Sequence, residues 1–362
     1  MVTIFSLLMG ITMNHATGSK KNLDWANLAF SYMKTDFRFE AIYRDGVWGP
    51  GEVVTSEVMP LHEGSPVLHY GQSCFEGLKA QTAKDGRILL FRPDLNSQRM
   101  QDSAERLLMP QIPDDLFMEG VYKCIQANLE WIPPYGSGAA FYLRPMLIGT
   151  GENLGLRPAP EYVFRVFGSP VGPYYKSGGL NMISLAVIDL DRAAPLGLGN
   201  YKVGANYAGG LLATRQAQAL GANEALYLDP RERKYLEEAG SANIVLALSG
   251  KRFATPASSS ILPSVTRKSV MTIAEKELGY TVEERQIDFL AEESDIEEMG
   301  ACGTAAVISP IGKILYQGNW HQIGRSANQP GPVMSDLYQR LTELQKGDRD
   351  DPYGWTVEVP QD

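Results

Sequence analysis

The sequence predicts a mixed α/β protein of two domains. At 362 residues the chain is longer than one typical hydrophobic core supports. Segments with apolar residues at helical spacing alternate with the short apolar segments that are typical of strands. A Gly- and Pro-rich stretch at 168–179 separates two strand-rich regions and predicts a linker. We therefore expect a loose extension, a smaller α/β domain, an interdomain linker and a larger domain, at residues 1–27, 28–170, 171–181 and 182–362.

The first half of the chain carries both strand and helix signals. The turn signal at Arg44–Gly46 predicts a hairpin. Two helices are expected, at 94–108, with Asp94 as the N-cap, and at 114–131, where apolar residues recur at helical spacing. The strand segments are expected within 41–55, 69–81, 88–91, 139–148 and 162–167.

The second half continues the same alternation beyond the linker. A glycine at 279 follows a helical pattern and predicts its end. The expected helices are 208–220, 264–278 and 333–345. The expected strands are 182–189, 224–228, 243–248 and 251–255, followed by a weakly alternating segment at 280–287.

Composition argues against several classes of function. The formal net charge is −9 and no long basic run occurs, so nucleic acid is not an expected partner. Cys74, Cys124 and Cys302 are far apart, and the four histidines are scattered. This distribution predicts neither a disulfide framework nor a metal site. Unpaired cysteines are typical of the reducing cytoplasm, where we expect the protein.

The N-terminus carries an apolar run from Val2 to Met9. The run is too short to cross a bilayer and no basic region precedes it, so no membrane association is expected. A loose extension, or a translation start at Met13, is favoured over an export signal.

A lysine in an unusual setting is the first functional signal. Lys202 lies in Gly199–Tyr207, a segment rich in glycine and aromatic residues with little charge around it. A surface lysine in a loop needs no such setting. A lysine that reacts with an aldehyde does, because burial lowers the pKa of the amine and frees it as a nucleophile.

Two further features follow Lys202 along the chain. Glu237 and Glu238 precede a small-residue turn and a strand, and in an extended segment they point to opposite faces. Ser264 to Thr266 open a helix, whose unpaired N–H groups suit a phosphate. A lysine, a carboxylate and a helix N-terminus are the three partners that the aldehyde, the ring nitrogen and the phosphate of pyridoxal phosphate require.

With these segments in this order, residues 28 to 346 resemble the fold-type IV pyridoxal phosphate enzymes, and among them the branched-chain amino acid aminotransferases. Tyr70–Lys79, Phe91–Met100 and the turn at Thr304 add to the resemblance. It implies a smaller N-terminal α/β domain and a larger C-terminal domain with a barrel-like sheet. It also implies a homodimer with active sites paired across the interface.

The resemblance implies a role for each part of the cofactor site. Lys202 would hold pyridoxal phosphate as a Schiff base, and its freed amine would carry the substrate proton. Glu238 is favoured over Glu237, because the acid of the family lies three residues before a hydroxyl, here Ser241. Arg99 would bind the phosphate with a bidentate guanidinium; Arg106 is a weaker candidate. The expected cofactor-binding residues are Arg99, Lys202, Tyr207, Glu238, Ser241, Leu262, Val265, Thr266 and Thr304.

A substrate pocket is expected on the strand that contains Tyr142 and Arg144. These two residues share one face of the strand, and Phe141 and Leu143 are expected in the core. An aromatic ring and an arginine suit both an aliphatic side chain and the distal carboxylate of glutamate. The resemblance also implies that Leu156 reaches the pocket of a neighbouring subunit. The expected substrate-binding residues are Phe30, Tyr70, Tyr142, Arg144, Leu156, Tyr174, Thr304 and Ala305.

The implied reaction is reversible transamination of L-leucine, L-isoleucine and L-valine with 2-oxoglutarate, giving branched-chain 2-oxo acids and L-glutamate. D-amino acid aminotransferase and aminodeoxychorismate lyase share the fold and the lysine and remain the alternatives.

One departure from the resemblance concerns the Cys-x-x-Cys of the mammalian-type enzymes. Ala306 and Ser309 occupy its two cysteine positions here, so thiol regulation of that kind is not expected. The glycines at 149–155 do not match a nucleotide-binding pattern.

Overall fold

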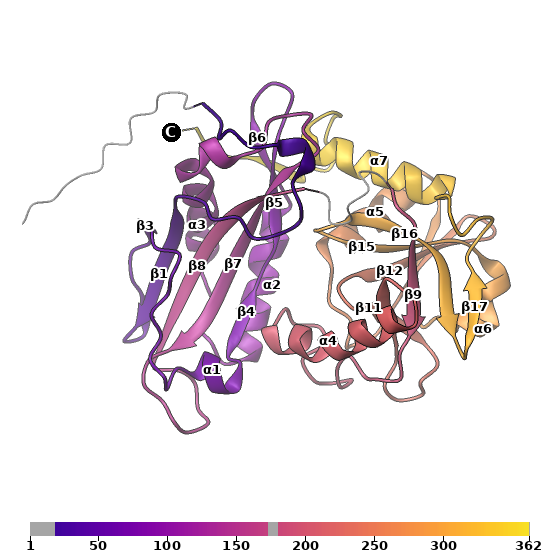
Figure 1. Ribbon diagram of the computed structural model, residues 1–362, viewed down its shortest axis with the longest axis horizontal. Helices are drawn as coiled ribbons and strands as arrows, with labels where there is room; N and C mark the ends of the chain where they lie inside the picture. Colours follow the sequence, from indigo (N-terminus) through magenta and orange to yellow (C-terminus); the bar gives the residue numbers. More distant parts are fainter. Residues whose placement is uncertain (1–18, 173–179, 362) are drawn as a thin grey trace, which may run out of the picture.

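A computed structural model describes residues 19–172 and 180–361, which form two large β-sheets with helices packed against them (Figure 1). The first sheet has the order β18-β6-β5-β7-β8-β1-β2, with β3 paired to β1 and β4 to β7. Its central pair is the long antiparallel β7 and β8. Its strands are β1 (Arg38–Arg44), β2 (Val47–Trp48), β3 (Glu52–Val54), β4 (Ser73–Phe75), β5 (Leu78–Thr82), β6 (Ile88–Phe91), β7 (Ala140–Thr150), β8 (Glu161–Val171) and β18 (Thr356–Glu358).

The second sheet closes on itself. Its order is β11-β10-β9-β16-β15-β12-β13-β14, with β17 on β16, and an additional β11–β12 pairing joins six of its strands into a barrel. This closure confirms the expected barrel-like sheet in the second half. Its strands are β9 (Ile183–Val187), β10 (Glu224–Leu228), β11 (Leu236–Ala239), β12 (Asn243–Leu248), β13 (Arg252–Pro256), β14 (Thr281–Arg285), β15 (Ile296–Gly303), β16 (Val307–Tyr316) and β17 (Asn319–Gln322).

The helices cover outer faces of the sheets and bridge between them. α3 packs on β1 and β8, and α5 packs on β15 of the barrel. α7 contacts both β16 of the barrel and β6 of the first sheet, so it ties the two halves together. The helices are α1 (Pro66–Tyr70), α2 (Pro93–Arg106), α3 (Asp114–Ala127), α4 (Gly204–Ala219), α5 (Val265–Lys276), α6 (Phe289–Glu292) and α7 (Pro332–Lys346), with short 3-10 turns at Trp25–Asn27, Leu129–Trp131 and Glu293–Asp295.

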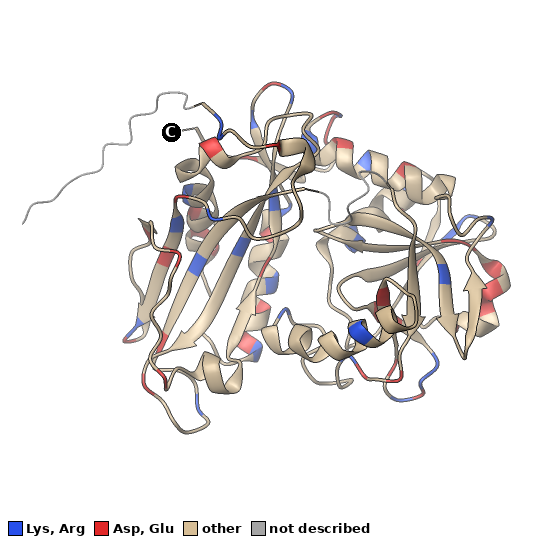
Figure 2. Ribbon diagram, in the orientation of Figure 1, with Lys and Arg blue, Asp and Glu red and all other residues tan. Residues whose placement is uncertain are grey.

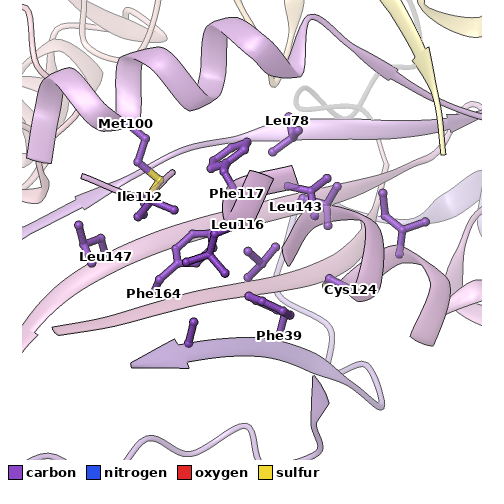
Figure 3. Close-up of a cluster of buried hydrophobic side chains, with 14 of the residues drawn as sticks. Phe39, Leu78, Met100, Ile112, Leu116, Phe117, Cys124, Leu143, Leu147 and Phe164 are labelled. Atoms are coloured by element: carbon purple, nitrogen blue, oxygen red, sulfur yellow. The ribbon is translucent and has the colours of Figure 1, made fainter. Parts of the chain in front are cut away.

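The core of the first half lies between its sheet and the helices α2 and α3 (Figure 3). Phe117 of α3 stacks on Phe164 of β8 with ring centroids 6.1 Å apart. Phe141 and Leu143 are fully buried, as their alternation predicts. A Cβ atom at position 168 would overlap the ring of Phe141, so only glycine at that point of β8 allows the ring to lie flat against it.

Several element boundaries differ from the expectation. The cap of α2 was wrong: Pro93 is its first residue, so Arg92 takes the N-cap position in the left-handed region (φ +48°) and Asp94 makes no capping bond. α3 ends at Ala127 rather than 131, because the Asn128 side chain bonds the carbonyl oxygens of Phe37 and Cys124 and turns the chain.

The stretch expected as a linker is partly strand. Residues 168–171 continue β8, because their backbone pairs with β7 up to Val171. Residues 173–179 lie outside the described part of the chain. The strand β18 near the C-terminus pairs with β6 of the first sheet, so the chain returns to the half from which it began. The proposed domain limits stay a prediction.

Charged side chains are distributed over both halves. Figure 2 shows basic and acidic residues interspersed along the elements in that view. Within the described ranges, no helix is long and apolar enough to cross a membrane, and no group of His, Cys, Asp or Glu is arranged to hold a metal. The three cysteines are buried and unpaired.

Candidate active site

A cavity of about 460 Å³ lies between the two sheets. Residues from both halves line it, with Phe30, Tyr142 and Arg144 from the first and Glu238 and Leu262 from the second. The cavity gathers residues that are far apart in the sequence but share the expected role of cofactor or substrate contact. The expected residues that line it are Phe30, Arg99, Tyr142, Arg144, Lys202, Tyr207, Glu238, Ser241, Leu262, Thr304 and Ala305.

Lys202 lies just before α4, and residues of the first half hold its backbone. Its amide donates to Ser103 Oγ at 2.9 Å, and its carbonyl accepts from the amide of Phe75 at 3.1 Å. The next residue, Val203, bridges to Cys74 of β4. The lysine loop is therefore fixed against the first sheet, which directs the side chain into the cavity.

The amine of Lys202 lies among aromatic rings. Its Nζ donates to the Tyr207 hydroxyl at 2.7 Å and lies 4.8 Å from the centre of the Phe75 ring. Burial lowers the pKa of Lys202 to about 8, and repulsion from Arg99 acts in the same direction. Burial also raises the pKa of Tyr207, so its hydroxyl stays protonated. A pKa of about 8 gives the amine a larger neutral fraction near neutral pH than its ordinary value of 10.5 would, and the neutral form is the nucleophile.

Glu238 of β11 reaches the cavity with a buried carboxylate. Arg192 lies 2.6 Å from its Oε1, the Leu262 amide donates to it at 3.2 Å, and Asn243 Nδ2 donates to Oε2 at 2.8 Å. Burial raises the pKa of Glu238, and these three partners oppose that shift. Glu237 points to the opposite face, where it accepts from Ser258 at 2.7 Å. The alternation of an extended segment thus separates the two acids.

The start of α5 forms one end of the cavity. Ser264 is the N-cap and its Oγ accepts from the Arg267 amide at 3.2 Å. Val265 and Thr266 line a small adjoining cavity, which Thr304 also lines, rather than the main one. This end combines first-turn N–H groups with hydroxyls, an arrangement that suits a phosphate group.

Arg99 lies near the same end. The edge of its guanidinium that could make two parallel hydrogen bonds, formed by Nε and Nη2, faces Glu76 rather than the cavity. Its Nε and Nη2 each donate to Glu76 at 2.7 Å, and Nη1 donates to the Pro263 carbonyl at 3.0 Å. The bidentate contact expected for a phosphate is therefore made to the Glu76 carboxylate. Two N–H groups of the guanidinium remain for a ligand.

Tyr142 and Arg144 of β7 also line the cavity. The Arg144 guanidinium lies 4.8 Å from the centre of the Phe75 ring and 5.6 Å from that of Tyr142. Among the described residues it forms no ion pair, and its buried Nε has no hydrogen-bond partner. Phe30 packs edge-on to Tyr142 at 5.2 Å. Arg144 is thus a cation in an aromatic pocket with free donors.

Two expected substrate residues, Tyr70 and Leu156, do not line this cavity. Tyr70 ends α1, is 43% exposed, and donates its hydroxyl to the Leu154 carbonyl. Leu156 is 85% exposed in the loop after β7. Tyr174 lies outside the described residues. Tyr70 and Leu156 therefore contact no ligand in the cavity of their own chain.

The sequence interpretation missed the partners of the charged groups. Arg192 was not singled out, although it forms the ion pair with Glu238, and Phe75 was not recognised as the ring shared by Lys202 and Arg144. Glu76 lies within Tyr70–Lys79, which adds to the resemblance, but the sequence predicts no role for it. An arginine in a loop gives no signal of burial, so only the fold could identify the role of Arg192.

The fold and the cavity define a two-sheet α/β enzyme of the fold-type IV class, with a buried lysine amine between its halves. The model of the family "Amino-transferase class IV" matches residues 73–314, which is more than half of the chain. The chain belongs to this family, whose members depend on pyridoxal phosphate.

The chain is similar over nearly its whole length to curated relatives. A branched-chain-amino-acid aminotransferase of Haemophilus influenzae is 48% identical over 344 residues, 94% of this chain and 99% of the relative. One from Helicobacter pylori is 49% identical over 343 residues, 94% and 98% of the two chains. A solved branched-chain amino acid aminotransferase from Escherichia coli aligns with a TM-score of 0.73 at 28% identity, covering 91% of this chain and all of that one.

Removing the Lys202 amine should stabilise the cofactor-free protein near neutral pH. With its pKa at about 8 in the folded state and 10.5 as its ordinary value, Lys202 binds more protons when unfolded. Its charge therefore opposes folding below pH 8, and the penalty disappears as the pH rises toward 10.5. We expect Lys202→Met to raise the free energy of unfolding at pH 7 by up to about 3 kcal/mol.

The measurement is denaturant unfolding of the cofactor-free proteins at pH 7 and at pH 10. The gain should shrink between the two pH values. Lys84→Met removes an exposed lysine and serves as the control, with little change at either pH. Equal effects of the two substitutions would contradict a desolvated amine at Lys202.

Proposed function

We propose that this protein catalyses reversible transamination of L-leucine, L-isoleucine and L-valine with 2-oxoglutarate, using pyridoxal phosphate held as a Schiff base by Lys202. The observation that carries the proposal is one cavity with a desolvated lysine amine, a buried carboxylate and a helix N-terminus. The names of the relatives that match nearly the full chain support the branched-chain specificity.

The residues of the cavity fit the cofactor by their donor and acceptor chemistry. Glu238 would accept from the ring nitrogen, while Arg192 and Asn243 keep its carboxylate oriented. The first-turn amides of α5, Thr304 and the two remaining N–H groups of Arg99 would hold the phosphate. Leu262 would pack on the ring, and Ser241 would hydrogen-bond nearby.

A solved relative supports this assignment. It is a branched-chain amino acid aminotransferase of "T.th." with pyridoxamine 5'-phosphate, and it is 26% identical to this chain. The two align with a TM-score of 0.74, covering 91% of this chain and all of that one.

When bound, pyridoxal phosphate supplies an aldehyde carbon that accepts amino groups and a ring that draws electrons from the substrate α-carbon. The Lys202 amine, once free, would accept the proton from the substrate α-carbon and would donate it back in the later half of the proton transfer. A pKa of about 8 suits both directions of that transfer near neutral pH. The Tyr207 hydroxyl keeps the amine in the cavity through its hydrogen bond.

The substrate groups would meet further residues that line the cavity. Backbone N–H groups at Thr304 and Ala305 would bind the α-carboxylate. Phe30 and Tyr142 would pack on an aliphatic side chain. Arg144 lacks an acidic partner in the described part of the chain, so it would bind the distal carboxylate of glutamate or 2-oxoglutarate. Such a pocket takes an apolar side chain or a carboxylate in the same space.

The visible spectrum of the purified protein tests this proposal. We expect an absorption band of the bound cofactor that L-leucine or L-valine removes and 2-oxoglutarate restores. The control is Lys202→Ala, which should lose steady-state turnover, since no other lysine lines the described part of the cavity.

The same experiment separates the alternative functions. Loss of the band with D-alanine alone would assign a D-amino acid aminotransferase. Formation of an aromatic product from aminodeoxychorismate, without a response to L-leucine, would assign the lyase. Absence of any band after addition of pyridoxal phosphate would refute the cofactor.

Arg144 should separate the two kinds of substrate. We expect Arg144→Met to raise KM for 2-oxoglutarate by about 100-fold, since a charge-assisted carboxylate contact is lost, and to change KM for L-leucine only a few-fold. Initial rates with each substrate varied in turn measure this. An equal rise in both KM values would show that Arg144 supports the pocket as a whole rather than the distal carboxylate.

We also propose a homodimer in which the loop after β7 contacts the partner's cavity. An apolar surface formed by Leu68, Tyr70, Leu154 and Leu156 supports it, because these residues are 43% to 88% exposed and adjacent through the Tyr70–Leu154 hydrogen bond. Exposed leucines gathered at one place are typical of an interface.

Sedimentation equilibrium should give twice the mass of one chain. Leu154→Asp combined with Leu156→Asp should shift the protein to monomers and reduce turnover. Leu108→Asp, at an exposed leucine after α2, is the control and should leave the dimer intact. A monomeric wild-type protein would refute the assembly.

A further inference from the structure

A second cavity, of about 370 Å³, adjoins the candidate active site. Ala305 lines both cavities, so this turn separates them. The second cavity is formed by β5 of the first sheet, by residues after β15 and at the start of β16, and by the C-terminal end of α7. It is thus at the junction that α7 makes between the two halves (Figure 1).

Two lysines line this second cavity, and none of its described lining residues is acidic. Lys79 of β5 and Lys346 of α7 line it, and the described lining contains no Asp or Glu. Burial lowers the pKa of Lys79 to about 8, and Lys346 is the charged group that adds to the shift. The only hydrogen bond of the Lys79 amine within the described chain goes to the Ala305 carbonyl, at 2.7 Å. Two cations with no counter-ion in a partly buried cavity are electrostatically costly.

Nearby carboxylates are engaged elsewhere. Glu343 precedes Lys346 on α7, but its carboxylate accepts from Gln339 at 2.8 Å. Asp348 accepts from the Tyr135 hydroxyl at 2.7 Å. Neither residue lines the cavity. Lys346 gains some stabilisation from the carbonyl end of α7, while Lys79, on a strand, has no such helix end of its own.

Some neutral polar side chains of the cavity have hydrogen-bond partners, as Ser137 and Thr342 do, and others have none in the described part of the chain. The side chains of Gln81, Ser309, Tyr338 and Gln345 line it, and none makes a hydrogen bond to another residue in the described ranges. Ser309 is only 4% exposed. A partly buried surface of hydroxyls, amides and two ammonium groups has the donors that an oxyanion requires.

We propose that this cavity is a second binding site for a small anion that carries phosphate or carboxylate oxygens. Lys79 and Lys346 bind the anion by charge, and the hydroxyls and amides around them donate to its oxygens. The anion supplies the counter-charge that the described part of the chain does not place there. The Lys79 amine contacts both the cavity and the Ala305 carbonyl, which connects occupancy of this site to the turn that faces the candidate active site.

Binding of inorganic phosphate to the cofactor-loaded protein tests the site. The loaded form is used so that the phosphate position at the start of α5 is already taken. Isothermal titration at constant ionic strength should show saturable binding. Lys346→Gln should weaken it by about tenfold or more, since one charge-assisted contact is lost. Lys79→Gln should do the same.

The matched control is Lys276→Gln, which also removes a lysine from the last turn of a helix, α5, and the same charge. It should leave the titration unchanged. Absence of saturable binding of both phosphate and succinate, or equal weakening by Lys276→Gln and Lys346→Gln, would overturn the proposal. Titration with succinate identifies the source of the oxygens. If succinate alone shows saturable binding that Lys346→Gln removes, the site takes dicarboxylates. If phosphate alone shows such binding, the site takes phosphate.

A kinetic measurement tests the connection to the turn, and this part rests on the proposed function. Saturating anion should change KM for L-leucine in the wild-type protein while kcat stays the same, and Lys346→Gln should remove the change. A KM that does not respond to a bound anion would overturn the connection. Failure of the proposed reaction in a protein that still binds the cofactor would appear instead as absence of turnover, with the titration unaffected.

Discussion

The constraint on which the site depends is a lysine amine held out of water between two sheets without a carboxylate beside it. The loop of Lys202 belongs to the second half of the chain, but Ser103 and Phe75 of the first half fix its backbone. The aromatic rings of Phe75 and Tyr207 then exclude water from the amine. Desolvation opposes its charge, so the stability of the surrounding fold sustains the reactive form.

The other charges of the cavity divide into two kinds. Arg99 and Arg192 are each paired with a buried carboxylate, Glu76 and Glu238. Buried pairs of this kind contribute little net stability, but they fix where each group points. Arg144 and Lys202 have no such partner in the described chain. The paired groups suit contacts to a cofactor that stays bound. The unpaired groups suit contacts to substrate groups that bind and dissociate in each reaction.

The turn at Ala305 connects several features of the molecule. Its residues line the candidate active site on one side and the cavity with Lys79 and Lys346 on the other. Lys79 reaches it from the first sheet, although the turn belongs to the barrel. A contact across the halves at this point links the position of the turn to the packing of the two sheets. Ala306 and Ser309 also line the second cavity.

The sequence by itself determined most of the helices and several strands, the burial of alternating residues such as Phe141 and Leu143, and Lys202 and Arg144 as candidates, because these depend on local spacing and on residue type. The preference for Glu238 over Glu237 came from the family resemblance, and strands β15 to β18 were not expected. The sequence could not determine partners. Arg192 with Glu238, Glu76 with Arg99, and Lys79 with Ala305 are separated by 46, 23 and 226 positions in the chain. Only the closure of the barrel and its packing against the first sheet bring them together, since hydrogen bonds and ion pairs require distances that sequence spacing does not encode.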